Sequence, residues 1–155
     1  MPSRALIQQT AGNGVATTKT FAPLTGDLTA IQSGSGNAVQ NFGCSYDVLG
    51  RLTSRSDANS ALSESFTYDA LSRLATAQVG VDIAKSFSYN TIGNILIKSD
   101  VGNYTYPAPG QPFPHAVSSI SGSVVNTTFT YDSNGNQTGG NNGLTLTYAS
   151  FKVYV

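Results

Sequence analysis

The chain has 155 residues, and its 8 Lys and Arg residues balance its 8 Asp and Glu residues, so its formal net charge is zero. Only 10% of the residues are charged, whereas a typical soluble domain carries about 25%. Such a surface has no electrostatic preference for nucleic acid or for an anionic membrane, and it lacks the net repulsion that opposes self-association. The length is that of one domain and is sufficient for a hydrophobic core.

The composition favours strands and tight turns over helices. Tyr occurs 8 times, Phe 7 times and Gly 16 times, whereas Glu64 is the only glutamate. Cys44 is the only cysteine, so an internal disulfide is excluded. Residues 1–14 lack the apolar stretch of a secretory signal peptide, and no run of about 18 apolar residues predicts a membrane-spanning helix. We therefore expect no membrane insertion, and any export would depend on a larger system.

The N-terminal part of the chain is predicted to lead into a repetitive region. Residues 1–20 are expected to form a lead-in strand or arm. Residues 21–31 resemble a hairpin whose turn, around Pro23 and Gly26, has one extra residue. The Ser- and Gly-rich residues 33–37 then form a loop to the next strand.

Four segments that follow begin with Tyr-Asp or Tyr-Asn and align with one another. Their leading tyrosines are 22, 21 and 42 residues apart. The last interval equals two periods, so the unit between residues 94 and 129 is degenerate or rebuilt. The residues that we assign to the repeat turns are Tyr46, Asp47, Gly50, Tyr68, Asp69, Tyr89, Asn90, Gly93, Tyr131, Asp132 and Gly135. The repeat domain is predicted to span residues 21–148.

Each motif predicts a tight turn. Asp47 stands where a type I turn favours Asp, and Gly50 stands at the fourth position, where Gly is favoured. The Asp side chain can accept a hydrogen bond from the amide two residues on, which fixes the turn, and Asn90 can do the same. Ser72 replaces the Gly in the second unit, so a left-handed backbone there would cost about 1 kcal/mol.

The residues on either side of each turn predict strands. Apolar and polar residues alternate before each turn, as in Phe66-Thr67-Tyr68, and an apolar residue such as Leu74 follows it. One repeat is therefore one hairpin with an aromatic face turned inward. A single hairpin is marginally stable, whereas stacked hairpins share this face. The predicted fold class is all-β: consecutive antiparallel hairpins with a period of about 21 residues in one curved, twisted sheet.

The C-terminal third is less regular. Residues 107–123 contain four prolines, so we expect an irregular unit that is a loop or an edge segment and not a central strand. Residues 144–148 alternate like a strand, and residues 149–155 are expected to belong to a further, interrupted strand.

The motif Tyr-Asp-x-x-Gly-Arg-Leu at this period resembles the RHS (rearrangement hot spot), or YD-repeat, family. The segment Pro114-His115-Ala116-Val117 also looks like the penultimate region of that family. The resemblance implies a β-sheet strip that winds into a hollow shell. Such shells enclose a variable C-terminal toxin in polymorphic toxins and in C-type subunits of insecticidal toxin complexes, whereas a related barrel in teneurins serves adhesion.

The chain departs from that family in one chemical respect. The resemblance implies self-cleavage at an Asp-Pro-x-Gly signature, and this sequence contains no Asp-Pro pair. About six hairpins would make an open sheet whose free edges invite pairing with another chain.

Candidates for chemistry are few, and each has a simpler structural interpretation. His115 has no Cys, Asp or Glu cluster beside it in sequence, and Cys44 occupies a strand position where other units carry Phe. Residues 132–136 lack the Gly and Glu spacing of a calcium loop. The repeated aspartates would line one rim, where carboxyl pairs for glycoside hydrolysis could meet only by accident. We therefore predict that the protein has no catalytic, cofactor or metal site and that it is not an enzyme.

The predicted function is part of the encapsulating β-shell of an RHS-type toxin or surface protein, secreted or at the cell surface and cytoplasmic before export. The expected partners are other RHS repeats or copies of the chain, through sheet edges, and an enclosed toxin polypeptide. Two alternatives remain open. One is an adhesion or carbohydrate-binding module that takes glycans on its tyrosines, and the other is a self-assembling fibre or tube subunit. No nucleic-acid partner is expected.

Overall fold

The computed structural model describes residues 6–141 and 143–149. Within these ranges the chain consists of antiparallel β-strands, turns and one short 3-10 helix. No helix in the described ranges is long and apolar enough to cross a membrane. The chain divides into two compact units, residues 1–84 and 85–155.

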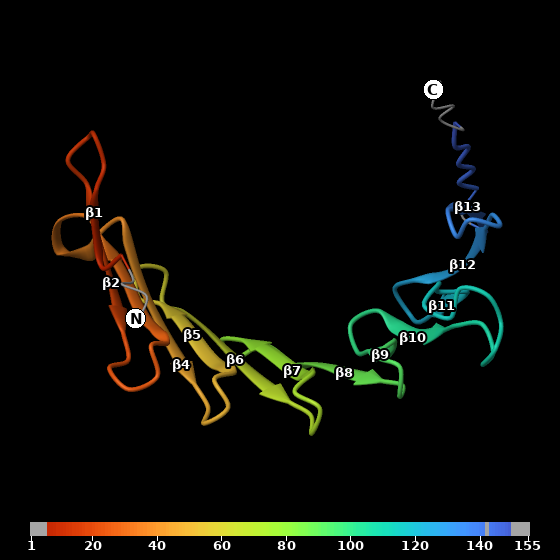
Figure 1. Ribbon diagram of the computed structural model, residues 1–155, viewed down its shortest axis with the longest axis horizontal. Helices are drawn as coiled ribbons and strands as arrows, with labels where there is room; N and C mark the ends of the chain where they lie inside the picture. The colour runs from red at the N-terminus through yellow and green to blue at the C-terminus, as the bar shows by residue number, and fades with distance from the viewer. Residues whose placement is uncertain (1–5, 142, 150–155) are drawn as a thin grey trace, which may run out of the picture. The chain divides into compact units, whose positions relative to one another are not determined.

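The first unit is a sheet in which the strands lie in the order of the sequence (Figure 1). Its elements are β1 (Gln8–Thr10), β2 (Ala16–Phe21), β3 (Leu28–Ser33), the helix η1 (Ser35–Asn37), β4 (Gln40–Tyr46), β5 (Leu52–Asp57), β6 (Leu62–Tyr68) and β7 (Leu74–Val79). Each strand pairs antiparallel with the next. The turns that join β2 to β3, β4 to β5 and β6 to β7 lie at the same end of the strands (Figure 1).

The second unit follows the same rule with shorter strands. Its elements are β8 (Lys85–Tyr89), β9 (Ile95–Lys98), β10 (Gly102–Thr105), β11 (Ser119–Ser121), β12 (Asn126–Tyr131) and β13 (Gln137–Gly140). Each strand pairs antiparallel with the next. The prediction of an all-β fold of consecutive antiparallel hairpins is therefore confirmed.

The two faces of the sheet in the first unit differ chemically, because successive side chains of a strand point to opposite faces. On β6, Phe66 and Tyr68 alternate with Thr67, whose Oγ1 lies 2.6 Å from Oγ1 of Thr76 on β7. The amide of Gln32 likewise donates to Asn41 across β3 and β4 at 3.2 Å. Cross-strand hydroxyl and amide pairs therefore line one face, and aromatic and aliphatic side chains line the other.

The expectation of a hydrophobic core was wrong for the part of the chain that the structure describes. No hydrophobic residue in it is buried, whereas the polar Ser33 and Asn94 are, with 5% and 7% of their surface exposed. The physical reason is that each unit is one layer of sheet and contains no second layer, among its described residues, to cover its apolar face. A domain normally buries an apolar face by packing two layers together.

Other expectations had mixed outcomes. In the first hairpin Phe21 pairs with Leu28, seven positions further along, whereas Tyr46 pairs with Leu52, six positions further along, which confirms the longer turn. Ser119–Ser121, expected in a loop or at an edge, form a strand with partners on both sides, because the prolines end at residue 114.

At the C-terminal end, residues 144–148 form only a bridge between Thr145 and Gly139 and not a strand. The short β13 ends in Gly139 and Gly140, which offer no side chains to pack against a further strand. The strand expected at residues 149–155 lies almost entirely outside the described residues. The expected domain boundaries at residues 20 and 148 stay predictions.

Candidate functional site at the hairpin corners

The four Tyr-Asp or Tyr-Asn motifs share one backbone geometry, which we call a corner and number by its first and last residues: 47–51, 69–73, 90–94 and 132–136. In corner 47–51, the amide of Asp47 donates to the carbonyl of Arg51 at 2.9 Å, and the amide of Gly50 donates to the carbonyl of Asp47 at 3.0 Å. The other three corners repeat both bonds. The fourth residue has a positive φ in each, namely 75° in Gly50, 60° in Ser72, 91° in Gly93 and 82° in Gly135.

The side-chain oxygen of the first residue in each corner accepts hydrogen bonds from backbone amides of the same turn. In corner 69–73, Oδ1 of Asp69 accepts from the amides of Leu71 and Arg73, both at 2.9 Å. Asn90 makes the same pair of bonds, to Ile92 at 3.1 Å and to Asn94 at 2.9 Å. An amide oxygen can therefore replace the carboxylate in this role.

The last residue of a corner adds a side-chain partner that the sequence analysis did not predict. Nε of Arg51 donates to Oδ2 of Asp47 at 2.7 Å, and Arg73 does the same to Asp69. In corner 132–136, Asn136 donates to Oδ2 of Asp132 at 3.0 Å. The signal in the sequence was an Arg four residues after each Asp of the first two motifs.

These bonds lower the pKa of each corner carboxyl below its ordinary value. For Asp47 and Asp69 the largest cause is the hydrogen bond from the backbone of the corner's own arginine. For Asp132 it is the bond from the Asn136 side chain. A carboxylate that accepts several hydrogen bonds is favoured over its protonated form.

Arg51 also links its corner to the next one. Its guanidinium lies 5.0 Å from the centre of the Tyr68 ring, within the range of a cation–π interaction. Its Nη1 donates to Oγ of Ser72 at 3.2 Å and lies 3.5 Å from the carbonyl oxygen of Asp69. One side chain thus contacts three residues of the following repeat.

Tyrosine hydroxyls make a second link between repeats. The hydroxyl of Tyr68 donates to the carbonyl of Leu52, the residue that follows corner 47–51, at 2.8 Å. The same relation joins Tyr106 to Ile95 at 2.9 Å and Tyr131 to Val117 at 2.9 Å. Burial raises the pKa of Tyr106 and Tyr131 above its ordinary value.

This tyrosine relation locates the repeat that the sequence spacing left unplaced. Tyr106 bonds back to the residue after corner 90–94, so it stands where Tyr68 and Tyr131 stand in their repeats. Val117 accepts from Tyr131, so it stands where Leu52 stands. The rebuilt repeat therefore has Tyr106 before its turn, Val117 after it, and a Pro-rich loop in place of a corner.

Comparison with known proteins agrees with this repeat geometry. The RHS Repeat family model matches residues 46–81, which include corners 47–51 and 69–73. The chain carries an RHS repeat. The resemblance drawn from the Tyr-Asp motifs is therefore confirmed, and no curated protein matches the chain.

Two solved structures share the fold of these RHS repeats. One is a crystal structure of TcdB2-TccC3-Cdc42, with 16% identity and a TM-score of 0.55. The other is a Photorhabdus luminescens Tc holotoxin pore with a mutated TccC3, with 16% identity and a TM-score of 0.54. Each match covers 84% of this chain but 9% of the other. At this identity the likeness establishes the fold alone.

The other two candidate residues belong to different units. Nδ1 of His115 lies 2.6 Å from Oδ1 of Asn94, in the second unit. Cys44 lies on β4 in the first unit and is half-buried. No group of three or more His, Cys, Asp or Glu residues that could hold a metal ion occurs among the residues that the structure describes. The aspartates of the corners each bond within their own turns.

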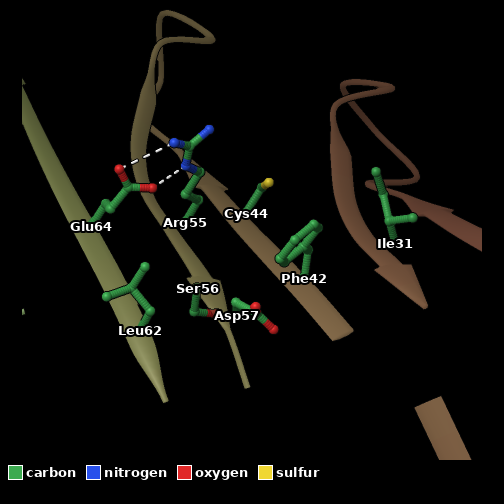
Figure 2. A pocket seen from close by; sticks show the side chains of 8 residues that line it. All are labelled: Ile31, Phe42, Cys44, Arg55, Ser56, Asp57, Leu62 and Glu64. Carbon is green, nitrogen blue, oxygen red and sulfur yellow. Dashed lines mark hydrogen bonds and ion pairs between the residues drawn. The ribbon is translucent and has the colours of Figure 1, made fainter. Parts of the chain in front are cut away.

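A pocket of about 430 Å³ lies on the apolar face of the RHS repeats in the first unit (Figure 2). Its lining residues are Ile31, Phe42, Cys44, Arg55, Ser56, Asp57, Leu62 and Glu64. The pairing of β3 to β6 aligns Ile31, Phe42, Asp57 and Leu62 in one row across four strands. Arg55 forms a two-bond ion pair with Glu64, whose pKa is lowered mainly by that hydrogen bond. The pocket thus combines apolar side chains with the Arg55–Glu64 ion pair and with Asp57, whose carboxylate accepts from the Asn59 amide and the Ser60 hydroxyl.

Proposed function

We propose that the chain is a non-enzymatic structural segment of the β-shell of an RHS-type toxin or surface protein. The links between repeats support a wall role, because three tyrosine hydroxyls join a repeat to the preceding one through a backbone carbonyl. The aspartates bond within their turns, so none of them is positioned as an acid or base toward a substrate. In this proposal the shell serves to enclose another polypeptide.

The observation that carries this proposal is the tyrosine link. Each hydroxyl bond from a tyrosine to a carbonyl of the preceding repeat fixes one hairpin against the previous one. A link that is satisfied between successive repeats can be extended indefinitely, which is the property of a solenoid or sheet strip. The chain therefore supplies a section of wall whose length is set by the number of repeats.

The apolar face supports the expected partners. Phe42 and Leu62 on that face keep 38% and 46% of their surface exposed, although both line the pocket. An apolar face of this kind is stable in water when other chain covers it. Other RHS repeats and an enclosed polypeptide are the partners that we assign to it, and the protein is secreted or at the cell surface when it acts.

The test is to express the reading frame together with its flanking coding sequence. We expect further Tyr-Asp corners upstream, an Asp-Pro-x-Gly segment downstream, and hollow particles in negative-stain electron microscopy. The polypeptide after the repeats should resist protease while the particle is intact and be digested after urea opens it. Equal digestion with and without the repeat region would contradict containment.

The self-assembly alternative has one supporting observation. Strand β1 is exposed along its whole length and pairs only with β2 among the described strands. An edge of this kind can pair with another chain. Light scattering during size-exclusion chromatography separates this case, because concentration-dependent growth of the purified chain supports fibres or tubes and a constant monomer mass excludes them.

A further inference from the structure

The corner 90–94 differs from the other corners in where its last side chain points. Asn94 is only 7% exposed, and its Nδ2 donates to the carbonyl of Pro114 at 2.7 Å. Its Oδ1 lies 2.6 Å from Nδ1 of His115. Both bonds go to the Pro-rich loop of the next repeat, 20 and 21 residues further along the chain. In contrast, Asn136 turns back to the first residue of its own corner.

The paired substitution of both charged residues explains this difference. Corners 47–51 and 69–73 have Asp first and Arg last, and the two side chains form an ion pair. Corner 90–94 has Asn at both places. Asn90 still holds the turn through Oδ1, so the turn does not depend on the carboxylate. Without an ion pair to make, the short amide of Asn94 can bond the loop instead.

The hydrogen bonds also fix the tautomer of His115. Because Nδ2 of Asn94 donates to Pro114, the Oδ1 atom that faces the histidine can only accept. Nδ1 of His115 must therefore carry the hydrogen. His115 and the carbonyl of Pro114 thus hydrogen-bond the oxygen and the nitrogen of the same buried side-chain amide.

The other side of the loop rests on the following corner. The ring of Phe113 lies so close to Gly135 that a β-carbon there would come within 3.1 Å of it. Phe113 has a φ of 57°, a left-handed conformation that a phenylalanine rarely adopts and that persists only when its surroundings impose it. Within the loop, the amide of Ala116 donates to the carbonyl of Phe113 at 2.9 Å.

We propose that residues 107–117, which we call the latch, take the place of a regular corner and join the corners on either side. The side chain of Asn94 is the group that binds the latch. One end of the latch is held by the amide of Asn94 in corner 90–94, and the other end by the contact of Phe113 with corner 132–136. The irregular repeat thus keeps its neighbours in register without an ion pair of its own. The latch is independent of what the wall encloses.

The decisive variant restores a regular corner. Asn90→Asp with Asn94→Arg gives corner 90–94 the first and last residues of corner 69–73 and removes the Asn94 amide, while the turn keeps its internal bonds. We expect hydrogen exchange of the Ala116 amide to become at least tenfold faster, with little change in the amides of Ile92 and Gly93. The matched control, Asp69→Asn with Arg73→Asn, changes a corner that has no such loop. It should leave the exchange of Ala116 unchanged.

A second measurement does not depend on how well that variant folds. His115 is the only histidine, so its imidazole nitrogens give an unambiguous nitrogen NMR spectrum. In mildly alkaline buffer the wild-type ring should carry its hydrogen on Nδ1, and Asn94→Ala should abolish this preference. A wild-type ring that carries its hydrogen on Nε2, or a loop whose exchange is unaffected in the Asp-Arg variant, would overturn the latch.

Discussion

Corners 69–73 and 90–94 have the same backbone bonds but stabilise the protein in different ways. Asp69 accepts from the backbone amide and from the guanidinium of Arg73, so the first and last residues of that corner bond each other. Asn90 bonds its own turn but Asn94 bonds a loop 20 residues away. The last side chain of a corner can therefore bond the first residue of its own corner or a loop of the next repeat, while the backbone bonds of the turn stay the same.

A second comparison sets the regular repeats of the first unit against the irregular repeat of the second unit. In the first unit the corners repeat with little change and additional contacts, such as those of Arg51, run to the next corner. In the second unit the backbone at Gly102 lies directly against the backbone at Ser121, so that a β-carbon on Gly102 would collide with the Ser121 carbonyl oxygen. We therefore expect an added side chain at Gly102 in the irregular repeat to be more costly than one at a corner glycine of the regular repeats.

The largest effect that this contrast predicts is for Gly102→Ala. Gly102 has a φ of 141°, and a β-carbon there would collide with the Ser121 carbonyl oxygen. Steric overlap and backbone strain together should destabilise the protein by about 3 kcal/mol. Gly50→Ala is the control, because φ is 75° but nothing lies within 4 Å of the added carbon, so only about 1 kcal/mol of strain is expected. Urea unfolding measures both, and equal losses would show that the close approach is unimportant.

The tyrosine links should come next in size. Tyr68→Phe removes the hydroxyl that donates to Leu52 and leaves that half-buried carbonyl without this partner, so we expect a loss of about 1 kcal/mol. Tyr131→Phe should cost a similar amount in the second unit, because the bond to Val117 has the same geometry. Tyr148 is 51% exposed, so Tyr148→Phe is the control and should leave the urea midpoint unchanged. A loss only in the first unit would show that the link does not extend through the irregular repeat.

Much of this architecture could be predicted because the corner chemistry is local. The turn is specified by an Asp or Asn, which bonds the backbone amide two residues later, and by a Gly three residues after that Asp or Asn. Alternating apolar and polar side chains specify the strands. The bonds of Asp47 to the amides of Leu49 and Arg51 follow directly from this spacing. The fold class followed from the repetition of such turns.

The links between repeats and the open apolar face could not be predicted in the same way. Which carbonyl the hydroxyl of Tyr68 reaches depends on the register of neighbouring strands, which the sequence does not state directly. The partners of Asn94 lie beyond a loop whose path the prolines alone do not define. The absence of a buried core in the described residues depends on how many layers pack together, and the period of the repeat carries no information about that.

Acid should separate the charged corners from the amide corner. The pKa values of Asp47, Asp69 and Asp132 are lowered in the folded chain. Their contribution to stability is therefore present above the ordinary Asp pKa of about 3.9 and is lost as the pH falls through the lower folded values. Replacing all three by Asn, as in corner 90–94, should flatten this loss in urea unfolding. Glu64 and Asp100, whose pKa values are also lowered, should leave a residual slope. An unchanged pH profile would show that the corners do not depend on charge.

The smallest predicted effect is also the most informative about Arg51. Ser72 has a φ of 60°, so Ser72→Gly should relieve about 1 kcal/mol of strain. The same change removes the exposed hydrogen bond from Arg51, worth about 0.5 kcal/mol, so we expect a net stabilisation of about 0.5 kcal/mol. In an Arg51→Ala background this bond is already absent, and Ser72→Gly should then give the full gain of about 1 kcal/mol. An equal gain in both backgrounds would mean that Arg51 does not couple the two corners, and a loss in both would contradict the left-handed turn itself.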